Sequence, residues 1–332
     1  MEENLQMRMS AAKACFSRLG AALVLIAVIT SALQVVLGVA AKIYMELTGV
    51  DLNSISWVMW AMTFVPLYAV GVPVGLTVLK GMSKDEGTPT PLGVGRFWTM
   101  LLICFPVMYV GNLVGTVLSS LLSGGTAVNG LESYALDNSI WKVLVMVVLA
   151  PLVEEYVFRK QLMDRCLRYG EKTAVVFSAL TFGLFHMNLF QFFYAFGLGL
   201  IFAYVYLKTR RLRYCVAMHM AINFTGSVLA PWVVSQLDMD ALSNLSSQTL
   251  DEATLAAIAP GLLLFLGYML VYLALVVVGL VLLVVKRKQV EFHPAPEELP
   301  REGRLKVVYG NPGVIVFMVL CAIAVVSSLL PV

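Results

Sequence analysis

Long apolar stretches set the first constraint on the fold of this chain. A helix needs roughly 20 apolar residues to cross the hydrocarbon of a bilayer. Only helices and closed barrels can span lipid, because backbone polar groups must be satisfied internally. We therefore expect an all-α fold, a polytopic transmembrane helical bundle of about nine spans. The apolar runs lie at about residues 19–43, 56–79, 97–122, 140–158, 173–190, 191–207, 214–236, 260–285 and 313–330.

The composition agrees with a lipid environment. The chain of 332 residues is 60% hydrophobic and 13% charged, whereas a soluble domain carries about 25% charged residues. The mean hydropathy is +0.86. The first apolar run is too long for the core of a cleavable signal, so we interpret it as the first span. The five cysteines have no paired spacing, which argues against a disulfide framework or a zinc knuckle.

Basic residues predict the orientation of the spans, because Lys and Arg collect in cytoplasmic loops. All but two of the 23 basic residues lie before the first run or after the second, fourth, sixth and eighth runs. The exceptions, Lys42 and Lys142, lie at helix ends, where long side chains can reach the interface. We expect a cytoplasmic N-terminus, an external C-terminus and an external loop at 238–259. The net charge of +3 is spread over these loops and needs no nucleic-acid partner.

The order of the runs suggests three parts. Residues 1–138 would hold the first three spans, and residues 139–236 would form a core of spans four to seven. Residues 237–332 would hold the last two spans and a charged, Pro-rich cytoplasmic loop at 286–306, which we expect to be flexible.

Ionisable groups inside the runs are few, and they are the candidates for function. Such a group costs about 2.5–3.5 kcal/mol near the centre of a span. Glu154 and Glu155 end the fourth run, while His186 and His219 lie in the fifth and seventh regions. The remaining histidine, His293, lies in the charged loop. Two carboxylates and two histidines on three spans are therefore a joint pattern worth a functional hypothesis.

The spacing of these residues is helical, since residues four apart share one face. Three pairs have this spacing: Glu155 with Arg159, Phe182 with His186, and His219 with Asn223. Arg159 can therefore orient Glu155. Glu154 lies about 100° around the helix from Glu155, so we expect the two carboxylates to point to different neighbours.

The depth of the candidate residues along their helices predicts where the fifth helix begins. His186 lies 14 residues after Lys172, which is about 21 Å of helix, whereas Glu154 lies about 7 Å from Arg159. The candidates can meet only if the fifth helix is strongly tilted or begins outside the membrane, near Glu171 or earlier.

Each feature alone has an ordinary structural explanation. The stretch from Glu154 to Arg159 could be the cytoplasmic end of a helix whose charges reach the headgroups. A histidine in a span is more often a satisfied interhelical hydrogen bond than a catalyst, and Phe182 alone would be a packing residue. The joint pattern favours a site over these explanations.

The ordered motifs resemble those of a known family. E-E-x-x-x-R at 154–159, F-x-x-x-H at 182–186 and H-x-x-x-N at 219–223 are similar to the motifs of the CPBP family. Its members are intramembrane proteases that process CAAX proteins and bacteriocins, and they include prenyl-protein endopeptidases. The glycine-rich stretch at 196–212 also looks like a span of that family. The resemblance covers about residues 140–226, and each motif position is intact.

The resemblance implies an intramembrane endopeptidase that hydrolyses a peptide bond of a membrane-associated protein or peptide. Such a reaction needs an activated water, an oxyanion donor set and a proton for the leaving amine. The resemblance assigns water activation to Glu154 and His186, oxyanion stabilisation to His219 and Asn223, and supporting roles to Glu155, Arg159 and Phe182.

The cofactor is left open by the sequence. The family is often called a metalloprotease family, yet some members are described as metal-free glutamate proteases. Zinc needs three protein ligands and an open position, which Glu154, His186 and His219 could supply. The chain has no H-E-x-x-H motif. A zinc-dependent reaction and a metal-free reaction are both retained as alternatives.

Two other classes of function are also retained. A non-catalytic family member could act as a membrane scaffold or immunity protein with the same motifs. A transporter would show repeated halves and broken helices, and we find neither in the sequence. The expected location is the bacterial cell membrane, with membrane lipids and a peptide or membrane protein as partners. The sequence does not identify the substrate.

Overall fold

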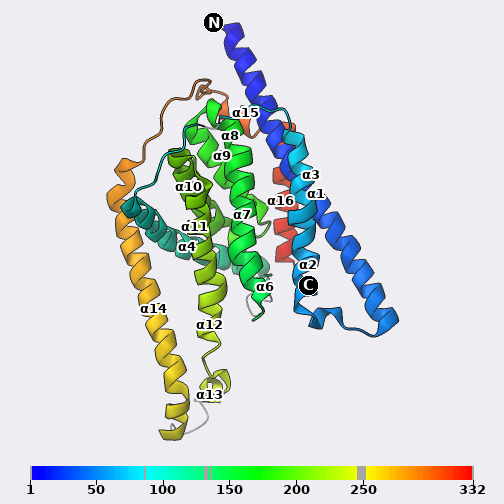
Figure 1. Cartoon of the computed structure of the whole chain (residues 1–332), viewed down its shortest axis with the longest axis vertical. Helices are drawn as coiled ribbons and strands as arrows, with labels where there is room; N and C mark the ends of the chain where they lie inside the picture. Colours follow the sequence, from blue (N-terminus) through cyan, green and yellow to red (C-terminus); the bar gives the residue numbers. More distant parts are fainter. Residues whose placement is uncertain (1, 86, 131–133, 135–136, 245–251, 331–332) are drawn as a thin grey trace.

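The computed structural model describes residues 2–85, 87–130, 134, 137–244 and 252–330, and these residues contain helices and no strand. Figure 1 shows an elongated bundle in which the long N-terminal helix begins at the upper end and the last helix runs downward to the C-terminus. The expectation of an all-α bundle is confirmed.

Helices follow the apolar runs closely. The N-terminal part contains α1 (Glu2–Thr48), η1 (Leu52–Ser54), one interrupted helix made of α2 (Ser56–Val65), η2 (Pro66–Gly71), α3 (Val72–Leu76) and η3 (Thr77–Leu79), and then α4 (Val94–Ser123). The next helix combines α6 (Ile140–Lys142), η4 (Val143–Leu149), α7 (Ala150–Glu155), η5 (Tyr156–Met163), α8 (Asp164–Cys166) and η6 (Leu167–Tyr169). The segments η2, η4 and η5 are π-helical.

The second half of the chain continues in the same way. It contains α9 (Glu171–Phe185), α10 (Leu189–Thr209) and one long helix made of α11 (Leu212–Phe224), η7 (Thr225–Leu229) and α12 (Ala230–Val234). It ends with α13 (Met239–Asn244), α14 (Glu252–Lys286), η8 (Arg287–Gln289), α15 (Arg304–Val308) and α16 (Pro312–Leu329).

Seven helices within the described residues are long and apolar enough to cross a membrane. Two expected spans are not among them. The helix from Ile140 carries Glu154, Glu155 and Arg159, and α9 has 15 residues. At 1.5 Å per residue α9 is about 22 Å long, shorter than the roughly 30 Å of hydrocarbon. The chain is a helical polytopic membrane protein, and the count of nine spans stays a prediction.

The loops rich in basic residues lie at one end of the bundle, close to the first turns of α1 (Figure 1). Backbone hydrogen bonds join them: Asp85 N donates to Asp164 O at 2.6 Å, Thr90 N to Thr209 O at 2.9 Å, and Leu299 N to Tyr169 O at 3.2 Å. The common end agrees with the alternation of basic residues. Residues 245–251 of the loop expected outside lie beyond the described residues.

The break between the fifth and sixth helices lies at 186–188, slightly earlier than the boundary near residue 190 expected from the apolar runs. Asn188 stops and restarts the helix because its side chain accepts a hydrogen bond from Gln191 N at 2.9 Å. Met187 has a φ of 55°, a left-handed conformation that ends α9. The helix α9 begins at Glu171, as the depth argument requires.

Two glycines on α4 hold this turn in place. A Cβ on Gly111 would lie 2.5 Å from Tyr194 Cα, and one on Gly115 would collide with the carbonyl oxygen of Leu189. Because both neighbours belong to the first turns of α10, a small-xxx-small surface lets the two backbones approach closely. The turn at 186–188 therefore rests against the middle of α4.

We predict that Gly111→Ala lowers thermal stability, because the new methyl group must displace the backbone of α10. Overpacking of this kind costs about 1–3 kcal/mol. Gly267→Ala is the matched control, since nothing lies within 4 Å of the added atom. Scanning fluorimetry in detergent measures both variants, and equal melting temperatures would contradict this account of the packing.

The orientation can be tested with introduced cysteines, because the five native cysteines are all buried. Lys84 follows the helix that contains α3 and Asp238 directly precedes α13, which lies at the other end of the bundle (Figure 1), and both residues are exposed. We expect Lys84→Cys to react with an impermeant maleimide only after permeabilisation, and Asp238→Cys to react in intact cells. The reverse pattern would overturn the predicted orientation.

Candidate active site

The predicted site residues come from three neighbouring helices of the core. Glu154 and Glu155 end α7, and Arg159 follows within the π-helical segment η5. Phe182 lies in the last turn of α9, and His186 caps that helix. His219 and Asn223 lie on α11, and both α9 and α11 pack against the helix that carries the two glutamates. The turn of π-helix after Glu155 is a feature often found at functional sites.

A buried ion pair joins Glu155 and Arg159. Arg159 Nε lies 3.0 Å from Glu155 Oε2, and both side chains are fully inaccessible to solvent. Arg159 also donates to Ser178 Oγ of α9 at 3.2 Å. The one-turn partnership predicted from the sequence is therefore present, and it also connects two helices.

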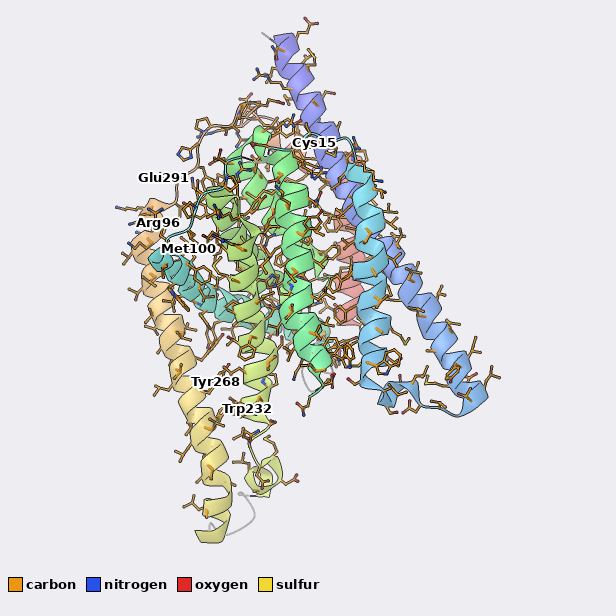
Figure 2. The ribbon with its side chains drawn as sticks, viewed as in Figure 1. Cys15, Arg96, Met100, Trp232, Tyr268 and Glu291 are labelled. Atoms are coloured by element: carbon orange, nitrogen blue, oxygen red, sulfur yellow. The ribbon has the colours of Figure 1, made fainter. Side chains whose placement is uncertain are left out.

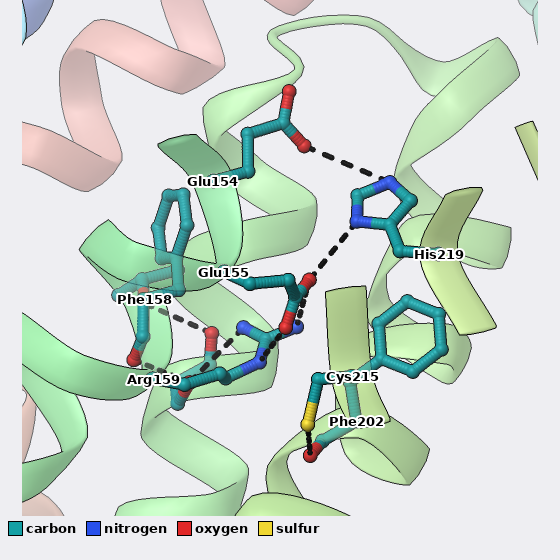
Figure 3. A network of polar contacts seen from close by, with 9 residues as sticks. Glu154, Glu155, Phe158, Arg159, Phe202, Cys215 and His219 are labelled. Atoms are coloured by element: carbon teal, nitrogen blue, oxygen red, sulfur yellow. Dashed lines mark hydrogen bonds and ion pairs between the residues drawn. The ribbon is translucent and has the colours of Figure 1, made fainter. Parts of the chain in front are cut away.

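His219 lies between the two adjacent carboxylates (Figure 3). Its Nδ1 is 3.0 Å from Glu155 Oε1, and its Nε2 is 3.9 Å from Glu154 Oε2. Each carboxylate also has a neighbour of its own, Arg159 for Glu155 and Tyr68 for Glu154, as the 100° rotation predicts. The sequence did not indicate that both would reach His219, whose ring presents one nitrogen to each of them.

Phe182 is the aromatic centre of the site. Its ring meets His186 edge-on at 5.0 Å and His219 at 5.8 Å between centroids. The guanidinium of Arg159 lies over the same ring at 4.8 Å from its centroid, a favourable cation–π geometry. Phe182 therefore contacts three of the predicted site residues.

His186 is held by its own helix. Its Nδ1 lies 2.9 Å from the carbonyl oxygen of Phe182, so Nδ1 is the nitrogen that carries hydrogen and donates. This hydrogen bond leaves Nε2 with its lone pair available. Among the described residues no hydrogen bond or ion pair joins His186 to Glu154; Phe182 links His186 to the remaining groups.

Asn223 makes no hydrogen bond with either carboxylate among the described residues. Its Nδ2 donates to the carbonyl oxygen of Met146 in η4 at 2.8 Å. It also lines a cavity of about 400 Å³ that lies between α4, α10, α11 and α14. The structure thus brings Glu154, Glu155, Arg159, Phe182 and His219 into direct contact, while His186 and Asn223 lie at the edges of this group.

Two further residues touch the site and were not singled out from the sequence. Phe202 of α10 stacks on His219 with centroids 5.3 Å apart. Tyr68 of η2 makes a side-chain contact with Glu154. Neither has a local pattern in its own stretch of sequence, although the two prolines around Tyr68, Pro66 and Pro73, mark an irregular helix.

An apolar groove of about 680 Å³ lies on the other side of Glu154. It is lined by side chains from η2, α7 and α11, among them Tyr68, Leu152, Val153, Arg213, Val216 and Met220. Because Tyr68 contacts Glu154 and Val153 precedes it, the groove ends beside this carboxylate. Glu154 has 19% of its side chain exposed, whereas Glu155 has none.

The metal ligands suggested by the sequence do not form a ligand set here. No group of three His, Cys, Asp or Glu side chains within the described residues is arranged to hold a metal ion. Nδ1 of His219 is occupied by Glu155 and Nδ1 of His186 by a backbone carbonyl, so only the two Nε2 atoms are open to a ligand. A zinc site needs three protein ligands gathered around one position, and the described residues show no such group.

We predict that Glu155→Gln destabilises the protein, because it leaves the Arg159 guanidinium buried without a counter-charge. Breaking a buried pair costs about 3–5 kcal/mol. Glu297→Gln is the control, since Glu297 pairs with Arg168 at 3.6 Å near the surface, where a pair contributes about 0–1 kcal/mol. Thermal unfolding in detergent measures both, and equal effects would argue against the buried pair.

Comparisons with known proteins agree with the motifs. Residues 136–225 match the family model described as type II CAAX prenyl endopeptidase, Rce1-like, close to the span of about 140–226 expected from the motifs. No curated protein and no solved structure matches the chain. The matched residues include both carboxylates, both histidines and Asn223. Residues 136–225 therefore form an Rce1-like segment similar to the CAAX proteases, a family of peptide hydrolases.

Proposed function

We propose that this intramembrane endopeptidase cleaves its substrate with a water molecule activated by Glu154. The observation that carries the proposal is the unequal environment of the two carboxylates. Both oxygens of Glu155 are engaged, one by Arg159 and one by His219. Glu154 is partly exposed, lies 3.9 Å from His219 Nε2 and is contacted by the Tyr68 side chain. Glu154 is thus the carboxylate with room for a water.

The gap between Glu154 and His219 suits a bridging water, since polar groups beyond 3.5 Å are often joined in this way. Glu154 would accept a proton from this water and later deliver it to the leaving amine. His186 Nε2, with its lone pair, would accept the second hydrogen of the water. This assignment keeps the roles that the family resemblance implies.

The oxyanion would be held by His219 and Asn223. A His219 ring protonated on both nitrogens can donate from Nδ1 to Glu155 and from Nε2 to the oxyanion. Asn223 Nδ2 carries two hydrogens, and Met146 O takes one of them, so the second can be donated to the oxyanion. Donors fixed in advance in this way are the usual basis of such stabilisation.

The substrate is proposed to be a membrane-associated protein or peptide with a long apolar portion. The groove beside Glu154 is lined almost wholly by apolar side chains, and Arg213 is the charged residue among them. An isoprenoid chain, as the family description implies, or an apolar peptide segment would suit it. We also propose that residues 139–236 form the catalytic core and that the enzyme acts in a bacterial cell membrane.

The mechanism predicts that Glu154→Gln abolishes cleavage without unfolding the protein, because the amide keeps the shape but cannot act as a base. His186→Ala should have the same effect. Asn223→Ala should keep residual activity, since loss of one oxyanion donor costs about 10²–10³ in rate. The assay is cleavage of a quenched, membrane-anchored peptide library by the purified chain, with Glu297→Gln as the active control.

Three outcomes of this assay decide between the alternatives. Undiminished turnover by Glu154→Gln would refute a protease site at this carboxylate. Loss of activity with a chelator, restored by zinc, would favour a metal-dependent reaction. A folded wild-type chain that cleaves nothing, with variants equally stable, would favour the non-catalytic scaffold.

A further inference from the structure

The cavity lined by Asn223 has an unusual chemical character, and we call it the neutral polar cavity. Its walls come from α4, η4, α10, the α11–η7–α12 helix, α14 and the loop after α4. No charged side chain lines it, yet amides and hydroxyls do. Tyr268 lies on α14 well below Arg96 and Glu291, which are near the basic end (Figure 2). The cavity therefore extends from the site away from the basic loops.

Asn112 is the feature of this cavity that most needs a physical explanation. It lies near the middle of α4, an apolar helix of 30 residues, and its side chain is exposed. Among the described residues its amide has no hydrogen-bond partner, and neither has the hydroxyl of Tyr268 across the cavity. Polar groups at membrane depth are costly without partners. An occupant with its own donors and acceptors would satisfy them.

The cavity is connected to the catalytic groups. Tyr194 lines it and accepts a hydrogen bond from Gln191 Nε2 at 3.0 Å. Gln191 is bonded to Asn188, which in turn donates to the carbonyl oxygen of His186 at 2.8 Å. Asn223, the proposed oxyanion donor, forms another part of the wall. An occupant of the cavity would therefore lie next to the reacting carbonyl.

We propose that the neutral polar cavity binds the substrate segment adjacent to the scissile bond, in a non-helical conformation and through uncharged polar groups. The proposal rests on the proposed function and adds a substrate class to it. A peptide unwound for cleavage exposes N–H and C=O groups that need partners inside a membrane. Amides and phenols supply both donors and acceptors, and a lining without charge rejects an acidic or basic side chain because no counter-charge is present.

The volume fits this occupant. About 400 Å³ lies within the usual range for ligand pockets and far exceeds the roughly 30 Å³ of one water. The substrates would be membrane-inserted peptides with Asn, Gln, Ser or Thr close to the cleaved bond. Peptides with Asp, Glu, Lys or Arg at the same positions would be cleaved poorly.

The test is the cleavage profile of a quenched peptide library randomised around the scissile bond, read by mass spectrometry. For Asn112→Leu we expect kcat/KM to fall about five- to tenfold for peptides with polar uncharged residues at the affected positions, the usual effect of one lost hydrogen bond. For peptides with Leu at the same positions, the kcat/KM of Asn112→Leu should equal that of the wild type. Tyr268→Phe, a smaller change on the opposite wall, should alter the profile in the same direction.

Gln34→Leu is the matched control, because Gln34 is an amide within α1 whose partner is Thr63 O, outside the cavity. It should leave the profile unchanged. A wild-type profile for both Asn112→Leu and Tyr268→Phe, or a uniform loss over all peptides, would overturn the proposal and leave a water-filled or purely structural cavity. Activity retained by Glu154→Gln would instead refute the proposed function itself, so the two failures are distinguishable.

Discussion

The buried ion pair between Glu155 and Arg159 is the contact on which the site depends. Removing two charges from water is costly, and attraction between them offsets that cost only with good geometry and further partners. Arg159 has such partners in Ser178 Oγ and the face of Phe182. The second oxygen of Glu155 receives His219 Nδ1. One pair thereby fixes α7, α9 and α11 relative to one another.

The same contacts determine which atoms are left for chemistry. His219 cannot turn without losing its bond to Glu155, and Phe202 stacked on its face also restrains it. Its Nε2 consequently stays directed toward Glu154. On the opposite side, the turn at 186–188 is fixed by Asn188 and by close contact of α10 with Gly111. The site is preorganised by backbone packing as much as by polar bonds.

Helix positions and one-turn pairs were predictable because they are local. Apolar runs define helices of known length, and four-residue spacing puts Arg159 beside Glu155 whatever the tertiary structure. Contacts between distant segments were not predictable in this way. Phe202 and Tyr68 reach the site from α10 and η2, and nothing in their own neighbourhoods indicates it. The meeting of both carboxylates at His219 likewise depends on how α11 packs against α7.

The position of one informative residue can be seen in the sequence alone. Asn112 lies in the middle of an apolar run, and the rule that singles out ionisable groups in spans extends to uncharged amides at lower cost. The role of Asn112 depends on the cavity, however, and the cavity is formed by several separate helices. A polar residue in a span indicates that a hydrogen-bond partner is needed there. Only the fold shows which side chains surround that residue.

The two spaces beside the site explain how neighbouring, chemically identical residues come to differ. The helix rotates Glu155 inward, where Arg159 and His219 engage it and solvent is excluded. Glu154, one residue earlier, lies beside the apolar groove with part of its side chain exposed. Environment rather than residue type separates paired carboxylates into different roles. In this chain a rotation of about 100° along one helix is sufficient to bury one glutamate completely and to leave the other partly exposed beside the groove.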